Sequence, residues 1–208
     1  QRRRHIEAIG VIRRLVDHHL AHPDEIPASY RDSNADLVTQ VADYVAEKCG
    51  IKPDRVSLAV AATRSLAGAV QIAARSVETA MHKLLELEFD VTKVLSGFGV
   101  CPIATPAADD MTAIGRTNDC VLYGSEVFLT ISATDAEIET LIDKIPSSSS
   151  RDYGQLFGEL FKRYDGDFYK IDPFLFSPAK ITITNAASGR TYRAGRFNAE
   201  LLRASLLG

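Results

Sequence analysis

The sequence contains few cysteines, no long apolar run and almost no net charge, and each of these features excludes a class of protein. No stretch approaches the roughly 20 consecutive apolar residues of a membrane-spanning helix, and the amino-terminal QRRRHIEAIG lacks the apolar segment of a secretory signal. The 24 basic and 27 acidic residues leave a net charge of −3, which offers no attraction for nucleic acid or anionic lipid. We therefore expect a cytoplasmic protein that binds neither.

The three cysteines, Cys49, Cys101 and Cys120, are an odd number and lie far apart, without a CxxC pair. We predict that they are reduced and mainly fill space in the core. The sequence also lacks a phosphate-binding glycine loop, a dinucleotide fingerprint, a nucleophile elbow and an HExxH helix. Several classes of cofactor-dependent enzyme are thereby excluded.

The composition is that of an ordinary globular protein, because 46% of the 208 residues are hydrophobic and 25% are charged. Helix, strand and hairpin signals are interleaved along the chain, which predicts an α/β fold with mixed sheets, or alternatively an α+β fold. The expected helices are 3–20, 35–48, 63–87, 134–145, 153–164 and 198–206. The expected strands are 56–62 and 94–100, with hairpins 120–132 and 181–193, and residues 101–119 are expected to be irregular.

The predicted helix 63–87 carries one polar set on an otherwise apolar sequence. Arg75 and Glu78 are three residues apart, and Glu78 and His82 are four apart, so that all three share one helical face. Such a face is either a solvated, structurally paired edge or a site held against a cleft. The spacing alone does not decide between them.

Two other groups could hold a metal ion. The pair Asp109 and Asp110 suits a hard cation, but it also suits a turn or a helix cap. His18, His19 and His22 lie near the end of a predicted helix, where they form either a transition-metal site or a surface cluster. A metal-dependent hydrolase that uses these residues is therefore one alternative.

Three segments together resemble methenyltetrahydromethanopterin cyclohydrolase: AARSVETAMHK (73–83), FGVCPIATPAADDMTAIGRTND (98–119), and SSSSRDYG (147–154) with YDGDFYKIDPFLFSP (164–178). The resemblance extends over essentially residues 1–208, but over only the carboxy-terminal two-thirds of the family's usual length. It implies a fragment that covers parts of two α/β domains with a cleft between them. It also implies a homotrimer that hydrolyses the methenyl bridge of tetrahydromethanopterin to the formyl derivative without a metal or an organic cofactor.

The resemblance assigns catalysis to Glu78 and Arg75, which occupy the matching Arg-x-x-Glu positions. Glu78 is expected to activate water and to return the proton to a leaving nitrogen, while Arg75 orients the carboxylate. His82 is expected to support them. The residues expected to bind the pterin are Arg116, Asn118, Asp119, Asp109, Asp110 and Ser65. The alternative from another class is an inactive pterin-binding or assembly protein, a truncated homologue.

Overall fold

A computed structural model describes residues 34–57 and 61–207 of the chain. The predicted helix 3–20 and the cluster His18, His19 and His22 lie outside these residues. Of the described residues, 34–57 and 165–168 belong to one compact unit, and 61–164 and 169–207 belong to a second. That the chain contributes to two domains around a cleft stays a prediction. None of the described helices is long and apolar enough to cross a membrane.

The first unit contains helix α3 (Asn34–Cys49), which confirms the predicted helix 35–48. Gly50 follows it with a φ of 65°, the left-handed conformation in which glycine commonly ends a helix. A short 3-10 helix, η1 (Pro53–Arg55), comes next. The predicted strand 56–62 is wrong at the four positions that are described, 56, 57, 61 and 62. An apolar run forms a strand only where another strand accepts its hydrogen bonds, and no described strand pairs with these residues.

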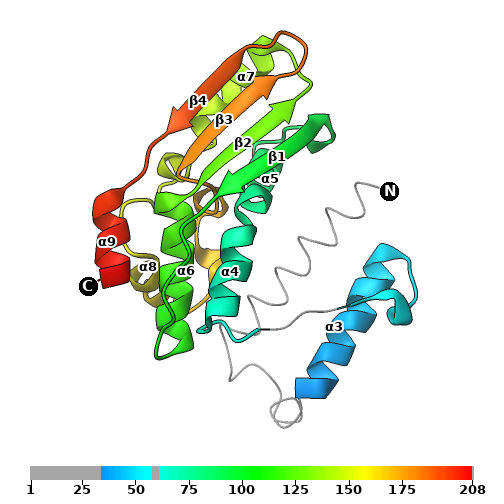
Figure 1. The fold of residues 1–208 in the computed structure, drawn as a ribbon, viewed down its shortest axis with the longest axis vertical. Helices are drawn as coiled ribbons and strands as arrows, with labels where there is room; N and C mark the ends of the chain where they lie inside the picture. Colours follow the sequence, from blue (N-terminus) through cyan, green and yellow to red (C-terminus); the bar gives the residue numbers. More distant parts are fainter. Residues whose placement is uncertain (1–33, 58–60, 208) are drawn as a thin grey trace. The chain divides into compact units, whose positions relative to one another are not determined.

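The second unit is built on a mixed four-stranded sheet, which confirms the predicted α/β class (Figure 1). Strand β1 (Val94–Val100) pairs antiparallel with β2 (Glu126–Ile131), and β2 pairs parallel with β3 (Lys180–Asn185). Strand β4 (Thr191–Gly195) returns antiparallel to β3, as the predicted hairpin 181–193 requires. The strand order is therefore β1-β2-β3-β4, with the predicted strand 94–100 at one edge.

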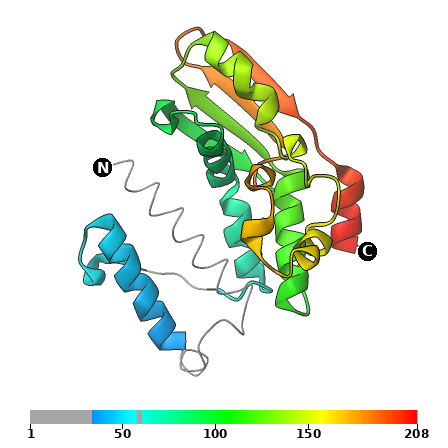
Figure 2. The ribbon, with the colours of Figure 1, turned by 180° about the vertical axis from the view of Figure 1, so that it is seen from behind.

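Helices cover one face of this sheet and pack beyond one end of it (Figures 1 and 2). Alternate residues of β2 and β3 are buried on the covered face, where α5 (Ser76–Glu86) and α7 (Asp135–Leu141) lie: Val127, Leu129, Ile131, Ile181 and Ile183. Beyond the end of the sheet, α6 (Asp110–Gly124) packs against α8 (Phe157–Arg163) and α9 (Ala199–Leu207), and α4 (Leu66–Ala74) packs against α6. Helix α9 confirms the predicted helix 198–206, whereas α8 is shorter than predicted.

Helix α6 contradicts two predictions, the irregular segment 101–119 and the hairpin 120–132. Only residues 101–109 are irregular, and the chain is helical from Asp110 to Gly124. Gly115 in the middle of α6 has a packing role. A Cβ atom built on Gly115 would lie 3.3 Å from the Cα of Gly158, so the absence of a side chain at Gly115 lets α6 cross close to the backbone of α8.

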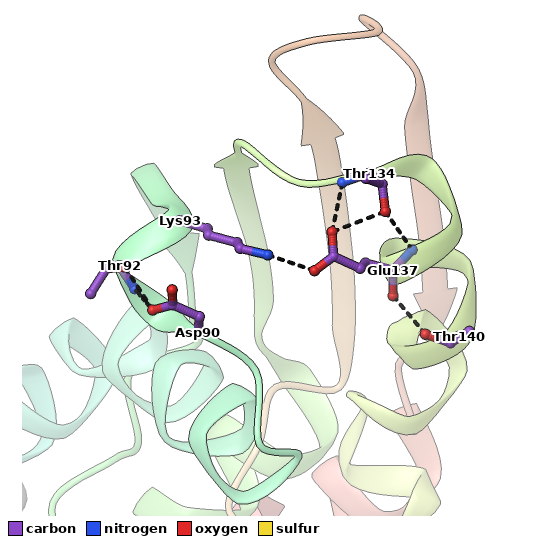
Figure 3. A network of polar contacts seen from close by, with 6 residues as sticks. All are labelled: Asp90, Thr92, Lys93, Thr134, Glu137 and Thr140. Atoms are coloured by element: carbon purple, nitrogen blue, oxygen red, sulfur yellow. Dashed lines mark hydrogen bonds and ion pairs between the residues drawn. The ribbon is translucent and has the colours of Figure 1, made fainter.

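A polar network joins the start of β1 to α7 (Figure 3). The helix predicted from residue 134 begins with a capping box, in which Glu137 N donates to Thr134 Oγ1 at 3.2 Å and Thr134 N donates to Glu137 Oε2 at 2.9 Å. The other carboxylate oxygen of Glu137 accepts from Lys93 Nζ at 2.5 Å. Lys93 ends the 3-10 helix η2 (Val91–Lys93), which Asp90 caps. Glu137 thus fixes the start of α7 to the segment that enters the sheet.

Candidate functional site

The predicted single helix 63–87 is two helices, α4 and α5, with a bend at Arg75. Arg75 has φ −86° and ψ 6°, and it is both the C-cap of α4 and the N-cap of α5. Its backbone N–H donates to Ile72 O at 3.0 Å, the tighter i to i−3 hydrogen bond that often closes a helix. Ser65 begins α4 as its N-cap, with Oγ accepting from Gly68 N at 3.1 Å.

Arg75 and Glu78 form the predicted pair at this bend. Arg75 Nε donates to Glu78 Oε2 at 3.0 Å, and each side chain is 22% exposed. Glu78 lies in the first turn of α5. The free N–H groups of a helix amino terminus favour a nearby negative charge. The bend therefore places a carboxylate between a helix amino terminus and a guanidinium, with part of its surface open to solvent.

Strand β1 holds this first turn at close range. Ser76 is 3% exposed, and Gly97 and Gly99 of β1 leave room for it and for Val77. A Cβ atom on Gly97 would lie 2.8 Å from Val77 Cγ1, and one on Gly99 would lie 3.3 Å from Ser76 Cβ. The two glycines of β1 thus permit the close approach of helix and strand.

His82 lies one turn after Glu78 on α5, as its spacing predicts. Its Nε2 is 3.9 Å from Glu86 Oε1, and the two side chains are 28% and 35% exposed. A supporting role for His82 at Glu78 stays a prediction.

Asp109 and Asp110 lie at the start of α6, where their contacts match the alternative of a helix cap. Asp109 Oδ1 accepts from Thr112 N at 2.8 Å, and Oδ2 accepts from Thr112 Oγ1 at 2.8 Å. These hydrogen bonds lower the pKa of the exposed Asp109 carboxyl. Asp110 occupies the first turn. Among residues 34–57 and 61–207, no three His, Cys, Asp or Glu side chains gather closely enough to hold a metal ion.

Arg116 and Asn118 are bound to neighbouring backbone rather than to the Arg75–Glu78 pair. Arg116 Nε donates to Ser205 O at 3.3 Å, and Nη1 donates to Pro106 O at 3.3 Å. Asn118 Nδ2 donates to Ile114 O within α6 at 2.9 Å. Arg116 therefore joins α6 to α9 and to the segment before α6, and the pterin-binding roles of both residues stay predictions.

Asp119 is a buried carboxyl, only 1% exposed. Its Oδ1 accepts from Phe157 N at 2.8 Å and so caps the start of α8. Burial raises the pKa of Asp119 to about 6, although hydrogen bonds from Ser205 and Phe157 oppose the shift. Because its side chain is enclosed by α8 and α9, contact with a pterin would require these helices to separate.

The cysteines are free thiols, as predicted. Cys120 is buried with Ala69 and Ala104, and Cys101 packs against this cluster. Burial raises the pKa of Cys101 to about 12 and that of Cys120 to about 11. Both thiols therefore stay protonated at neutral pH and act as packing groups.

Lys83 is the functional candidate that the sequence patterns did not indicate. It is 0% exposed, although it follows Glu78 by only five residues on α5. Lys83 Nζ donates to Ser149 Oγ at 3.0 Å and to the carbonyl oxygen of Phe174. The sequence feature that could have indicated Lys83 is its place among apolar helix positions. A charged side chain that is buried there must find hydrogen-bonding partners.

Comparison with known proteins gives the family. The family model described as Cyclohydrolase (MCH) matches residues 32–206. The chain belongs to this cyclohydrolase family. It is 46% identical over 187 residues to a methenyltetrahydromethanopterin cyclohydrolase of Rhodopirellula baltica, covering 89% of this chain and 56% of the relative. It is 47% identical over 169 residues to that of Methanocaldococcus jannaschii, covering 80% of this chain and 52% of the relative.

The cyclohydrolase match extends over all three segments that carried the resemblance, including Arg75, Glu78 and Lys83. A methenyltetrahydromethanopterin cyclohydrolase of a Methylobacterium strain is 44% identical over 188 residues, covering 90% of this chain and 58% of the relative. The chain thus spans little more than half the length of these three cyclohydrolases.

Proposed function

We propose that the full-length protein hydrolyses methenyl-tetrahydromethanopterin to formyl-tetrahydromethanopterin, with Glu78 and Arg75 at the reacting centre. The observation that carries the proposal is the 3.0 Å pair between Arg75 and Glu78 at a helix amino terminus, in a chain of the cyclohydrolase family. The names of the relatives supply the substrate class.

The chemistry requires one group that both accepts and donates a proton. The methenyl carbon lies between two nitrogens in an amidinium-like cation. Water adds its oxygen to this carbon, and one carbon–nitrogen bond then breaks as the added hydroxyl becomes the formyl carbonyl. Of the two protons of the water, one goes to the released nitrogen and the other leaves to solvent, which accounts for the loss of the positive charge. Glu78 accepts the proton from the attacking water and returns it to the leaving nitrogen. Its negative charge also attracts the cationic bridge.

Arg75 orients the Glu78 carboxylate. A guanidinium that donates to a carboxylate forms a short, directional hydrogen bond. The backbone N–H groups at the start of α5 add a favourable electrostatic interaction with the negative charge. These two interactions hold the carboxylate in one position when a substrate closes over it.

Replacing Glu78 by Gln tests the acid–base role in the full-length protein. We expect Glu78→Gln to lower kcat by about 10²- to 10⁴-fold, measured by the loss of methenyl absorbance. Glu200→Gln is the matched control, because Glu200 lies on the surface of α9. Near-normal turnover by Glu78→Gln would remove the proposed role.

A second candidate, from a different class, is an inactive pterin-binding or assembly protein. The chain covers only 56% of the Rhodopirellula relative, so the remaining part of such proteins could supply residues that turnover needs. Titrating residues 1–208 and the full-length protein with the methenyl pterin separates the two functions. Binding without turnover by both proteins favours the second candidate.

Assembly as a homotrimer, catalysis without a metal or organic cofactor, and a cytoplasmic location belong to the same proposal. These three expectations come from the resemblance of the sequence to the cyclohydrolase family. Light scattering of the full-length protein tests the trimer. Activity that survives exhaustive chelation would exclude the alternative metal-dependent hydrolase built on Asp109, Asp110 and the histidines.

A further inference from the structure

Lys83 is a fully buried cation on the helix that carries Glu78. Its Nζ donates to Ser149 Oγ at 3.0 Å and to the carbonyl oxygen of Phe174, and it lies 4.9 Å from the centre of the Phe174 ring. These partners come from two segments more than 60 residues further along the chain, η4 (Ser147–Ser149) and η6 (Pro173–Leu175). Lys83 therefore joins three separate parts of the chain at one point.

The two partner segments are themselves bound to each other. Asp172 Oδ2 accepts from Ser150 Oγ at 2.7 Å and from Arg151 N at 3.2 Å. Asp172 N in turn donates to Asp152 Oδ2 at 2.8 Å. Ser150, Asp152 and Asp172 are all buried. Lys83 thus binds to a preformed polar platform rather than to a loose loop.

Lys83 and Glu78 project from different sides of α5. Five residues correspond to about 140° around a helix axis, so Lys83 points into the protein while the Arg75–Glu78 side is partly exposed. Lys83 consequently cannot reach a substrate bound at Glu78. Any effect on the reaction must act through the position of the helix.

Burying the Lys83 ammonium group in this space has a free-energy cost. Desolvation lowers the pKa of Lys83 to about 8, although Asp172 and Glu86 oppose the shift. An apolar side chain of similar length would avoid this cost, but it would make no directional bonds. Two hydrogen bonds to different segments fix both the rotation and the axial position of α5, which nondirectional apolar packing does less strictly.

We propose that Lys83 is a positioning residue that sets the orientation of Glu78 by anchoring α5 to the Ser149 and Phe174 segments. The inference rests on the proposed function, since it explains how Glu78 is held for that reaction. Strand β1 holds the first turn of α5 through Gly97 and Gly99, and Lys83 holds its inner side two turns later. The helix is thereby fixed at two points on either side of Glu78.

The test replaces Lys83 by Met in the full-length protein, which keeps the side-chain length and removes the ammonium. We expect kcat to fall at least tenfold while KM changes less than threefold, because substrate still binds but Glu78 is misplaced. Amide hydrogen exchange in the first turn of α5 should become at least tenfold faster. Ile138→Ala is the control, because Ile138 is fully buried on α7 and its loss lowers stability without releasing α5.

Each outcome decides the proposal. If Lys83→Met keeps kcat within tenfold of the parent, or loses activity only in proportion to its lowered Tm as Ile138→Ala does, Lys83 is not a positioning residue. If Lys83→Met does not fold, Ser149→Ala decides, since it removes one partner of the ammonium. We expect it to lower kcat about threefold, and an unchanged kcat would overturn the proposal. If the parent has no hydrolase activity, the proposed function fails, and the exchange measurement alone still tests the anchoring.

Discussion

Ser76, the first residue of α5, lies directly against Gly99 of β1. A Cβ atom built on Gly99 would overlap Ser76 Oγ at a distance that real side chains do not adopt, and it would lie 3.2 Å from Val77 Cγ2. Ser76 follows Arg75 at the bend and precedes Glu78 by two residues. The close contact between Gly99 and Ser76 therefore sets the position of the proposed catalytic pair, Arg75 and Glu78.

Replacing Gly99 by Ala should displace the first turn of α5. We expect kcat to fall about a hundredfold, since a displacement of about 1 Å at a reacting group can have that effect. The free energy of unfolding should fall by about 1–3 kcal/mol, the usual cost of overpacking. Steady-state kinetics and urea denaturation of the full-length protein measure the two effects.

A second-site change distinguishes displacement from a general loss of folding. Ser76→Gly removes the side chain that an alanine at position 99 would meet, so the double variant should recover much of the lost kcat. Gly158→Ala is the matched control, because a Cβ there would make an ordinary contact 3.8 Å from Gly115 Cα. Equal losses in Gly99→Ala and in the double variant would contradict this explanation.

Replacing Arg75 by Lys should weaken the proposed site although it keeps the charge. A guanidinium presents Nε in a fixed plane, whereas an ammonium on a flexible stem does not reproduce that geometry. We expect kcat to fall about tenfold in Arg75→Lys and further in Arg75→Met, because Met also removes the hydrogen bond that orients Glu78. Steady-state kinetics of the full-length protein measure both variants. An unchanged kcat in Arg75→Met would show that Arg75 does not orient Glu78.

Asp119 should affect stability with a defined dependence on pH. Its pKa is raised from 3.8 to about 6 in the folded protein, so between pH 4 and pH 6 the folded state binds more protons than the unfolded state. Its contribution to stability is full below pH 4 and is lost as the pH rises through 6. Asp119→Asn should remove this slope in urea denaturation. Asp119→Ala, which leaves Phe157 N without its acceptor, should cost about 1–3 kcal/mol at every pH.

Local sequence was enough to predict elements whose side chains repeat with a clear period. Helix α3, the edge strand β1 and the β3–β4 hairpin are of this kind, and the Thr134 capping box has a fixed spacing of its own. The Arg75–Glu78 contact was likewise predictable, because three residues on a helix determine it. Each of these depends on neighbours in the sequence.

The failures involve partners that are distant in the sequence. Helix α6 contains polar residues at inward positions, and Asp119 is buried only because α8 begins against it. Gly115 marks a helix crossing with Gly158 rather than a loop. Lys83 finds its acceptors at Ser149 and Phe174. A single sequence contains no information about which distant segments will meet, so local patterns do not predict these contacts.

Glu137 should stabilise the start of α7 and its link to β1, and this stabilisation should depend on pH. Lys93 and then Thr134 lower the pKa of Glu137 from 4.5 to about 2. Because the pKa of Glu137 is lower in the folded state than in the unfolded state, its stabilisation is present above pH 4.5. This stabilisation is lost as the pH falls toward 2. The Tm difference between the parent and Glu137→Gln should therefore shrink steadily from pH 5 to pH 2.

Glu139→Gln, on the same helix, removes an exposed pair with Arg190 at 3.5 Å and should change Tm far less. Equal effects of the two substitutions at pH 7 would show that the capping box and the Lys93 contact do not hold α7 in place.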